Sequence, residues 1–230
     1  MYAKGDHAAA ELLCREALDV QRETVGSQHP HTLNSISNLG ALLKVKGDLA
    51  TTELLYREAL EGRRATLGDR HPSTLRSISN LGTLLKAKGD LAAAEPLLRE
   101  ALEGQRATLG SGHPDTPICM NNLGRLLQAK GDFAAAEPLY REALEGRRET
   151  LGSGHPDTLC SIGDLSMLLF RRKLGSTYTY IASLCRSPSL GSVTAALCAW
   201  TGCCKPKANS GPLKSFMGLV AESVADLYYP

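Results

Sequence analysis

The feature that most constrains this chain of 230 residues is a tripeptide, Lys-Gly-Asp, which recurs at a fixed interval. Its central glycines lie 42 residues apart, at Gly5, Gly47, Gly89 and Gly131. A His-Pro pair keeps the same interval, with its histidines at His29, His71, His113 and His155. A fixed period of this size is typical of a solenoid, in which each unit buries its apolar face against its neighbours. We therefore expect an array of small units and no single closed core.

The apolar residues inside one period follow a helical spacing. Between Thr32 and Lys46 they recur at steps of three and four residues, at Leu33, Ile36, Leu39, Leu42 and Leu43. This spacing places them on one face of an α-helix, the first of the unit, which we name helix A.

A short turn and a second helix follow in each period. Gly47 suits the left-handed conformation that ends a helix, and the Asp48 carboxylate can accept backbone N–H groups at the start of the next one. This second helix, helix B, is predicted to run to about Leu67, before Gly68. The histidine of His-Pro precedes the next helix A, because proline is tolerated in a first helical turn.

Two prolines depart from this pattern. Pro96 and Pro138 lie inside predicted B helices, where each removes a backbone hydrogen bond. We expect a kink or a loosened first turn in these two helices.

Composition and charge exclude several classes of function. Lys and Arg number 26 against 24 Asp and Glu, so the net charge of +2 favours neither nucleic acid nor a membrane. Seven irregularly spaced cysteines, with no leader at Met1, predict a reduced cytoplasmic setting. The histidines are spread one per unit and no nucleophile lies beside a base, so we expect no enzyme, no metal and no cofactor.

Further residues carry a resemblance to a known family. They are the Asn-Leu-Gly of helix A at Asn38, Asn80 and Asn122, the small residues Ala59, Ala101 and Ala143, and the Leu-Gly-x-x-His-Pro linker. The pattern resembles a tetratricopeptide repeat, and more narrowly the 42-residue version of kinesin light chain-like proteins. The resemblance implies an all-α, right-handed superhelical solenoid of antiparallel helix pairs, with a divergent C-terminal tail. Small side chains such as Gly40 and Ala59 let helices A and B approach closely.

The repeats divide the chain into an array, residues 1–174, and a tail, residues 175–230. The array consists of a partial unit 1–28, full units 29–70, 71–112 and 113–154, and a degenerate unit 155–174. The tail is rich in Ser, Gly and Pro, which predicts poor order, although the apolar spacing at 215–229 is that of an amphipathic helix.

The resemblance places helix A on the concave side of the superhelix, where family members bind peptides. The segments 32–46 and 73–88 contain no Asp or Glu, so this wall is basic and should attract an acidic peptide. The predicted peptide-binding groove consists of Asn34, Asn38, Lys44, Arg76, Asn80, Lys86, Asn121, Asn122 and Arg125.

Two functional hypotheses follow. The first is an adaptor or scaffold whose basic, Asn-lined groove binds extended acidic segments of partner proteins. Its amide groups would hold a peptide backbone, although the same Asn residues could instead tie the helices together. The second is a structural array that self-associates through its uncapped ends and has no dedicated peptide ligand.

Overall fold

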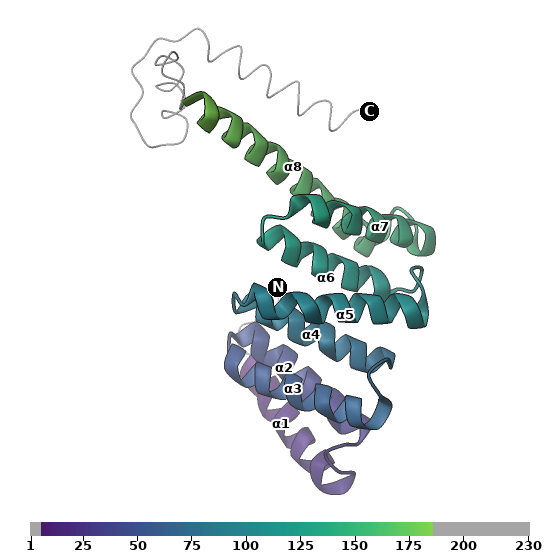
Figure 1. Cartoon of the computed structure of the whole chain (residues 1–230). Coiled ribbons are helices and arrows are strands. Elements are labelled where there is room, and N and C mark those ends of the chain that lie inside the picture. Colours follow the sequence, from purple (N-terminus) through teal and green to yellow (C-terminus); the bar gives the residue numbers. More distant parts are fainter. Residues whose placement is uncertain (1–5, 186–230) are drawn as a thin grey trace. The chain divides into compact units, whose positions relative to one another are not determined.

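The computed structural model describes the backbone of residues 6–185 and the side chains of residues 8–173. Eight α-helices and no strand occur within this range, and they follow one another through short turns (Figure 1). Their bounds are α1 Asp6–Thr24, α2 Pro30–Lys46, α3 Leu49–Leu67, α4 Pro72–Ala87, α5 Leu91–Leu109, α6 Asp115–Ala129, α7 Phe133–Leu151 and α8 Pro156–Cys185. The all-α repeat solenoid predicted from the sequence is therefore confirmed.

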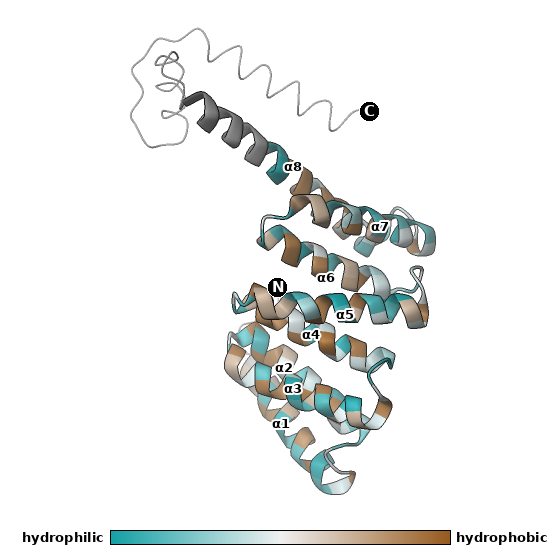
Figure 2. Ribbon diagram, in the orientation of Figure 1, coloured by the Kyte–Doolittle hydropathy of each residue, from teal (hydrophilic) through white to brown (hydrophobic). Residues whose placement is uncertain are grey.

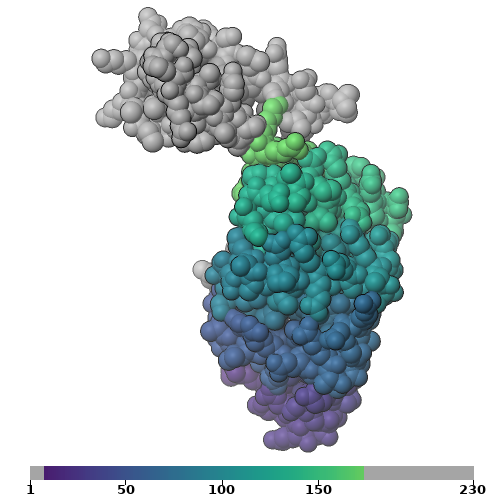
Figure 3. All heavy atoms as spheres, in the orientation of Figure 1, coloured from purple at the N-terminus to yellow at the C-terminus, as the bar shows by residue number. Residues whose placement is uncertain are grey.

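The helices alternate between the two types expected from the sequence. Helices α2, α4 and α6 are A helices, and α1, α3, α5 and α7 are B helices. Residues 6–170 belong to one compact unit, and residues 171–185 continue α8. The space-filling view shows that atoms of successive repeats are in contact along this unit (Figure 3).

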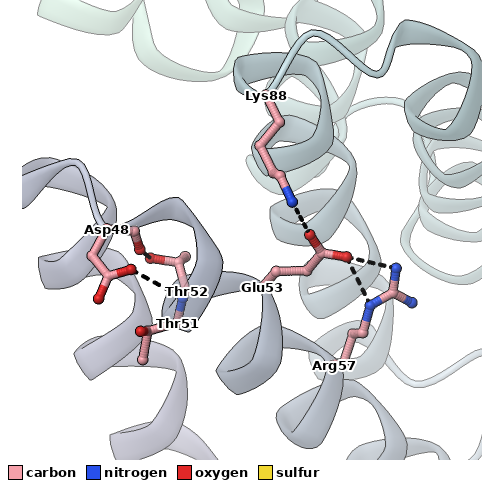
Figure 4. Close-up of polar contacts among 6 residues, drawn as sticks. All are labelled: Asp48, Thr51, Thr52, Glu53, Arg57 and Lys88. Carbon is pink, nitrogen blue, oxygen red and sulfur yellow. Dashed lines mark hydrogen bonds and ion pairs between the residues drawn. The ribbon is translucent and has the colours of Figure 1, made fainter.

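The turn between helices A and B forms as the sequence predicts. Gly47 adopts a φ of 88°, which is the left-handed region that favours glycine. The side chain of Asp48 then accepts a hydrogen bond from the backbone N–H of Thr51 at 3.1 Å (Figure 4). Asp90 and Asp132 make the same bond one and two periods later, at 3.0 Å.

The regular spacing of His-Pro also has a structural reason. The imidazole Nδ1 of His71 accepts a hydrogen bond from the backbone N–H of Ser73 at 3.1 Å. The other three histidines make the same bond to the residue two positions later, at His29, His113 and His155. Each histidine thus accepts a hydrogen bond at the start of an A helix. His29 and His71 are the N-cap residues of α2 and α4, whereas α6 begins one residue later, after Pro114.

The two internal prolines leave their helices intact. Helices α5 and α7 each contain 19 residues, as does α3, which has no internal proline. The backbone of Asp90 (φ −80°, ψ 75°) matches that of Asp48 (φ −79°, ψ 75°). The predicted loosening of the first turn is therefore absent, and the alternative of a kink stays a prediction. Pro96 and Ala92, whose carbonyl loses its N–H partner, are both exposed, so water can replace the missing bond.

Close approach of helices A and B depends on small residues at the contact. A Cβ atom on Gly40 would lie 2.6 Å from the ring of Tyr56, and one on Gly82 would lie 2.8 Å from Leu98. Ala59 is fully buried between helices. Each helix carries both apolar and polar residues (Figure 2). The buried apolar residues form two clusters, one within α1, α2 and α3 and one that extends from α3 to α8.

The last helix extends past residue 174, where the sequence pattern ends the array. Lys173 and Leu174 replace the Gly-Asp pair that ends each earlier A helix, so no helix stop occurs there, and α8 continues to Cys185. The helix predicted at 215–229 lies outside the described residues. No helix in the described part of the chain is both long and apolar enough to cross a membrane.

Candidate functional site

The A helices form a layer of their own, because their side chains contact one another across successive units. Lys44 of α2 reaches Thr83 of α4, with 3.5 Å from Nζ to Oγ1. The amide of Asn122 on α6 donates to the hydroxyl of Ser79 on α4 at 3.1 Å. We call the solvent-facing side chains of α2, α4 and α6 the A-helix face.

Two lysines stand out on the A-helix face. Lys44 and Lys86 are half-buried, and neither lies within ion-pair distance of a carboxylate among the described side chains. Burial lowers the pKa of both ammonium groups. The nearby positive charges of Arg125 and Lys44 lower the pKa of Lys86 further, while Asp164 acts in the opposite sense. These lysines therefore form a cationic patch that lacks a counter-charge at contact distance.

Arg125 differs from these lysines because the chain itself neutralises it. Its Nη2 atom lies 3.0 and 2.9 Å from the two carboxylate oxygens of Asp164 on α8. This residue of the predicted groove is therefore already paired.

A buried arginine contributes a second cationic point, which the sequence analysis missed. Arg63 of α3 is 3% exposed. It donates to Asn34 Oδ1 at 2.7 Å, to Ser37 Oγ at 3.0 Å, to Leu33 O at 3.2 Å and to Ser77 Oγ. All of these acceptors are neutral. Burial, together with the charge of Arg76, lowers the pKa of Arg63 to about 10.

The predicted asparagines divide into three groups. The side-chain amides of Asn38 and Asn80 make no hydrogen bond to any described residue, and Asn38 is exposed. Asn34 and Asn122 are engaged by Arg63 and Ser79, as described above. Asn121 is only 7% exposed, and its Oδ1 is buried without a partner, so it presents little surface to a ligand.

The B helices carry a different set of charges, arranged as ion pairs between units. Arg22 pairs with Glu58, Arg64 with Glu100 and Arg106 with Glu142, each across 36 residues. A second series joins the end of each A helix to the preceding B helix, as in the Lys88–Glu53 pair (Figure 4). Glu53 also accepts from Arg57, and these two cations hold the pKa of its carboxyl below the usual value.

No group of three or more His, Cys, Asp or Glu side chains among the described residues lies close enough to hold a metal ion. Burial raises the pKa of the Cys119 thiol to about 11, which keeps it protonated and unreactive at neutral pH.

Comparison with known families accounts for this arrangement. Models of the tetratricopeptide repeat match residues 1–31, 37–107, 79–149 and 121–174. The chain therefore belongs to the tetratricopeptide repeat family, and its repeats are of the kinesin light chain-like type. This family assigns it a general role in protein–protein interaction or as a scaffold.

Solved structures resemble the chain over most of its length. Two are crystal structures of a protein from Podosopora anserina described as a kinesin light chain with nearly identical TPR-like repeats. The first, a variant with one substitution, is 25% identical with a TM-score of 0.63, covering 86% of this chain and 89% of the other. The second is 25% identical with a TM-score of 0.62, covering 84% and 89%.

A third structure shares the fold alone. It is BtubC (BKLC) from P. vanneervenii, which is 23% identical with a TM-score of 0.64 and covers 90% of this chain and 80% of the other. A search of curated proteins gave no match.

Proposed function

We propose that the chain is an adaptor whose A-helix face binds extended acidic segments of partner proteins. One observation carries this proposal: Lys44 and Lys86 are adjacent, half-buried cations without a carboxylate at contact distance. Desolvated like charges repel each other, so a carboxylate placed between them relieves that repulsion and gains two charge-assisted contacts.

Arg63 and Arg76 support a second point of contact for the same ligand. The guanidinium of Arg63 is surrounded by neutral acceptors and lies beside exposed Arg76. A buried cation without a counter-ion is costly, and an anion bound at Arg76 would lower that cost. A ligand with acidic groups spaced along its length therefore fits this face better than one with a single charge.

The amides of Asn38 and Asn80 supply recognition that does not depend on ligand sequence. Each presents a donor and an acceptor that no described side chain occupies. An extended peptide backbone offers the same two groups at each residue. These amides would hold the backbone while the lysines select acidic side chains.

The third A helix offers an apolar contact beside these charges. Ile118 stands one and two periods after Arg76 and Asn34, respectively, and is 48% exposed. Because it replaces polar residues at the same register, it favours a ligand that combines acidic residues with one apolar or aromatic residue.

The test is binding of a fluorescein-labelled peptide in which Glu alternates with Ser around a central Trp. The full chain should bind it, and added salt should weaken the binding. The double variant Lys44→Gln, Lys86→Gln should lose roughly tenfold or more in affinity, because a hydrogen bond to a charged group is worth about 1.5–3 kcal/mol and solvent screens part of this at half-buried sites.

Lys130→Gln is the matched control, since Lys130 pairs with Glu95 away from the A-helix face. It removes a positive charge and should leave the affinity unchanged. A peptide with Gln in place of Glu should bind far more weakly. Equal affinities for the parent chain and the double variant, at unchanged helicity, would refute the proposal.

A second role, structural self-association, is favoured by apolar side chains exposed at both ends of the array. Leu13 and Val20 of α1 and Leu159 and Phe170 of α8 are all exposed. This role does not compete with the first, because these residues lie outside the A-helix face of α2, α4 and α6. We also propose a cytoplasmic setting, supported by the odd number of cysteines.

A further inference from the structure

The first helix presents the surface of a B helix that normally lies against other helices. Leu13 and Val20 are exposed, and with Glu16, Ala17 and Gln21 they line a hollow on α1. Ala17 is exposed, whereas Ala59, its equivalent one period later, is 1% exposed. The Oε1 atom of Gln21, beneath this surface, is buried without a hydrogen-bond partner.

The last described helix presents the opposite surface, that of an A helix without a B helix against it. Leu159 of α8 is 55% exposed, whereas its equivalents Leu33 and Leu75 are almost fully buried. In the inner units these leucines lie against a glycine of the following B helix, as Leu75 does against Gly104. The uncovered faces of α1 and α8 are therefore the two halves of one repeat unit.

We propose that the chain assembles head to tail, with α8 of one copy packing as the A helix against α1 of the next copy. This inference rests on the structural role proposed above and not on peptide binding. Each junction would complete a 42-residue unit, so the array would continue from copy to copy. Such a contact joins two different surfaces and does not close on itself, which produces open chains of copies.

The ion pairs between B helices support this register. Each pair joins an Arg to a Glu 36 residues later. Arg148 is the equivalent arginine in the last B helix, and Glu16 is the equivalent glutamate in the first. Neither has an ion-pair partner among the described side chains. If the series continued, the partner of Arg148 would stand at position 184, which lies four periods of 42 residues after Glu16. Glu16 therefore occupies the equivalent place in the repeat. Head-to-tail packing therefore places Glu16 of one copy opposite Arg148 of the other.

Side-chain size at one contact of the junction supports the same pairing. Inside the array a glycine of helix A faces a large residue of helix B, as in Gly40 with Tyr56 and Gly124 with Tyr140. At the junction the equivalent residues are Ser166 of α8 and Cys14 of α1. The larger residue on helix A is thus matched by a smaller one on helix B, which keeps the space filled. Val20 takes the place of a glycine, and exposed Leu159 must turn aside to meet it.

The test is sedimentation velocity of the full chain over a range of concentrations. The parent chain should form species larger than the 24.6 kDa monomer that grow with concentration. Glu16→Arg alone and Arg148→Glu alone should each weaken assembly roughly tenfold or more, because like charges would then face each other across the junction.

Mixing the two single variants is the decisive experiment for this junction. The arginine introduced at position 16 of one variant would meet the glutamate introduced at position 148 of the other. The unchanged Arg148 of the first variant would meet the unchanged Glu16 of the second. The mixture should therefore recover assembly in alternating copies, and so should the double variant on its own. A folding defect in either single variant could not produce this recovery.

Glu61→Arg is the control for charge reversal, since Glu61 is exposed in the middle of the array. It should not change assembly, and neither should Lys44→Gln, Lys86→Gln, which separates this inference from the peptide-binding proposal. A parent chain that stays monomeric at all concentrations overturns the inference. So does assembly that neither single variant weakens, or a mixture that fails to recover it.

Discussion

The Nη2 atom of Arg125 on α6 contacts both carboxylate oxygens of Asp164 on α8, at 3.0 and 2.9 Å. Asp164 occupies the register at which the three preceding A helices carry Asn38, Asn80 and Asn122. An acidic side chain therefore already lies at this position of the A-helix layer and pairs with a basic one.

Replacing Asp164 with Asn should strengthen binding of the acidic peptide. The change frees Arg125 and removes a negative charge close to Lys86, so affinity should rise by roughly threefold to tenfold and depend more steeply on salt. Fluorescence anisotropy with the Glu–Trp peptide would measure this. Asp69→Asn is the control, because Asp69 pairs with Arg64 on a B helix. An unchanged affinity in Asp164→Asn would place the ligand away from Arg125.

Two glycine-to-alanine changes should have opposite effects on stability. Gly82→Ala adds a Cβ atom 2.8 Å from Leu98 and 3.4 Å from the carbonyl oxygen of Ala94, so overpacking should cost about 1–3 kcal/mol. Gly163→Ala lies within helix α8 with open space around it and should stabilise by up to about 1 kcal/mol. Urea denaturation followed by circular dichroism would compare them, and a shift of the same sign in both would contradict this packing account.

The histidine caps predict a clear order among substitutions at residue 71. His71→Ala removes the acceptor for the Ser73 N–H and should cost about 1 kcal/mol. His71→Asn keeps an acceptor of similar reach and should stay within a few tenths of a kcal/mol of the parent. Thermal unfolding of the three chains would establish the order. If Asn were as harmful as Ala, the hydrogen bond would not be the reason for the histidine.

The ion pairs of Glu53 and Glu95 predict how stability depends on pH. Hydrogen bonds from Lys88 and Arg57, and from Lys130 and Arg99, lower the carboxyl pKa values from 4.5. A lowered pKa in the folded state adds stability above pH 4.5, which is lost as the pH falls through the folded value. The melting temperature should therefore drop in acid.

The double variant Glu53→Gln, Glu95→Gln isolates this contribution. It should lose about 1–2 kcal/mol at pH 7, since each site is worth roughly 0.5–1 kcal/mol, and it should show a smaller decrease in acid. Glu61→Gln, Glu103→Gln makes the same charge change at exposed residues and should behave like the parent. Parallel pH profiles for the parent and the Glu53, Glu95 variant would contradict the prediction.

Features encoded locally were predictable from the sequence. The period of 42 residues, the Gly47 turn, the Asp48 cap and the two helices of each unit depend on residues that are close together in the chain. The role of the histidines at helix starts was predictable for the same reason. Each of these features follows from backbone conformation and nearby hydrogen bonds.

Features that depend on contacts between units were harder to predict from the sequence. Arg63 lies among the charged residues of a B helix, a pattern that indicates a solvated face, yet it is buried between α2 and α4. Asn121 precedes the repeated Asn122 in a pattern that indicates polar surface, yet it is buried. Likewise, the pairing of Arg125 with Asp164 could be predicted only from the distance between α6 and α8. Helical spacing describes one helix and cannot show which neighbour covers it.

The left-handed glycines recur every 21 residues, at Gly26, Gly47, Gly68, Gly89, Gly110, Gly131 and Gly152. All of them have a positive φ, but ψ is 2° at Gly47, between an A and a B helix, and 167° at Gly68, between a B and an A helix. Two kinds of joint therefore alternate along the array, and each contact between units connects residues separated by a constant interval. Deleting residues 71–112 would bring Arg64 against Glu142 and Lys130 against Glu53, which recreates ion pairs that the array already makes. Gene duplication or loss can thus lengthen or shorten such a protein by whole units while the kind of contact between neighbours stays the same.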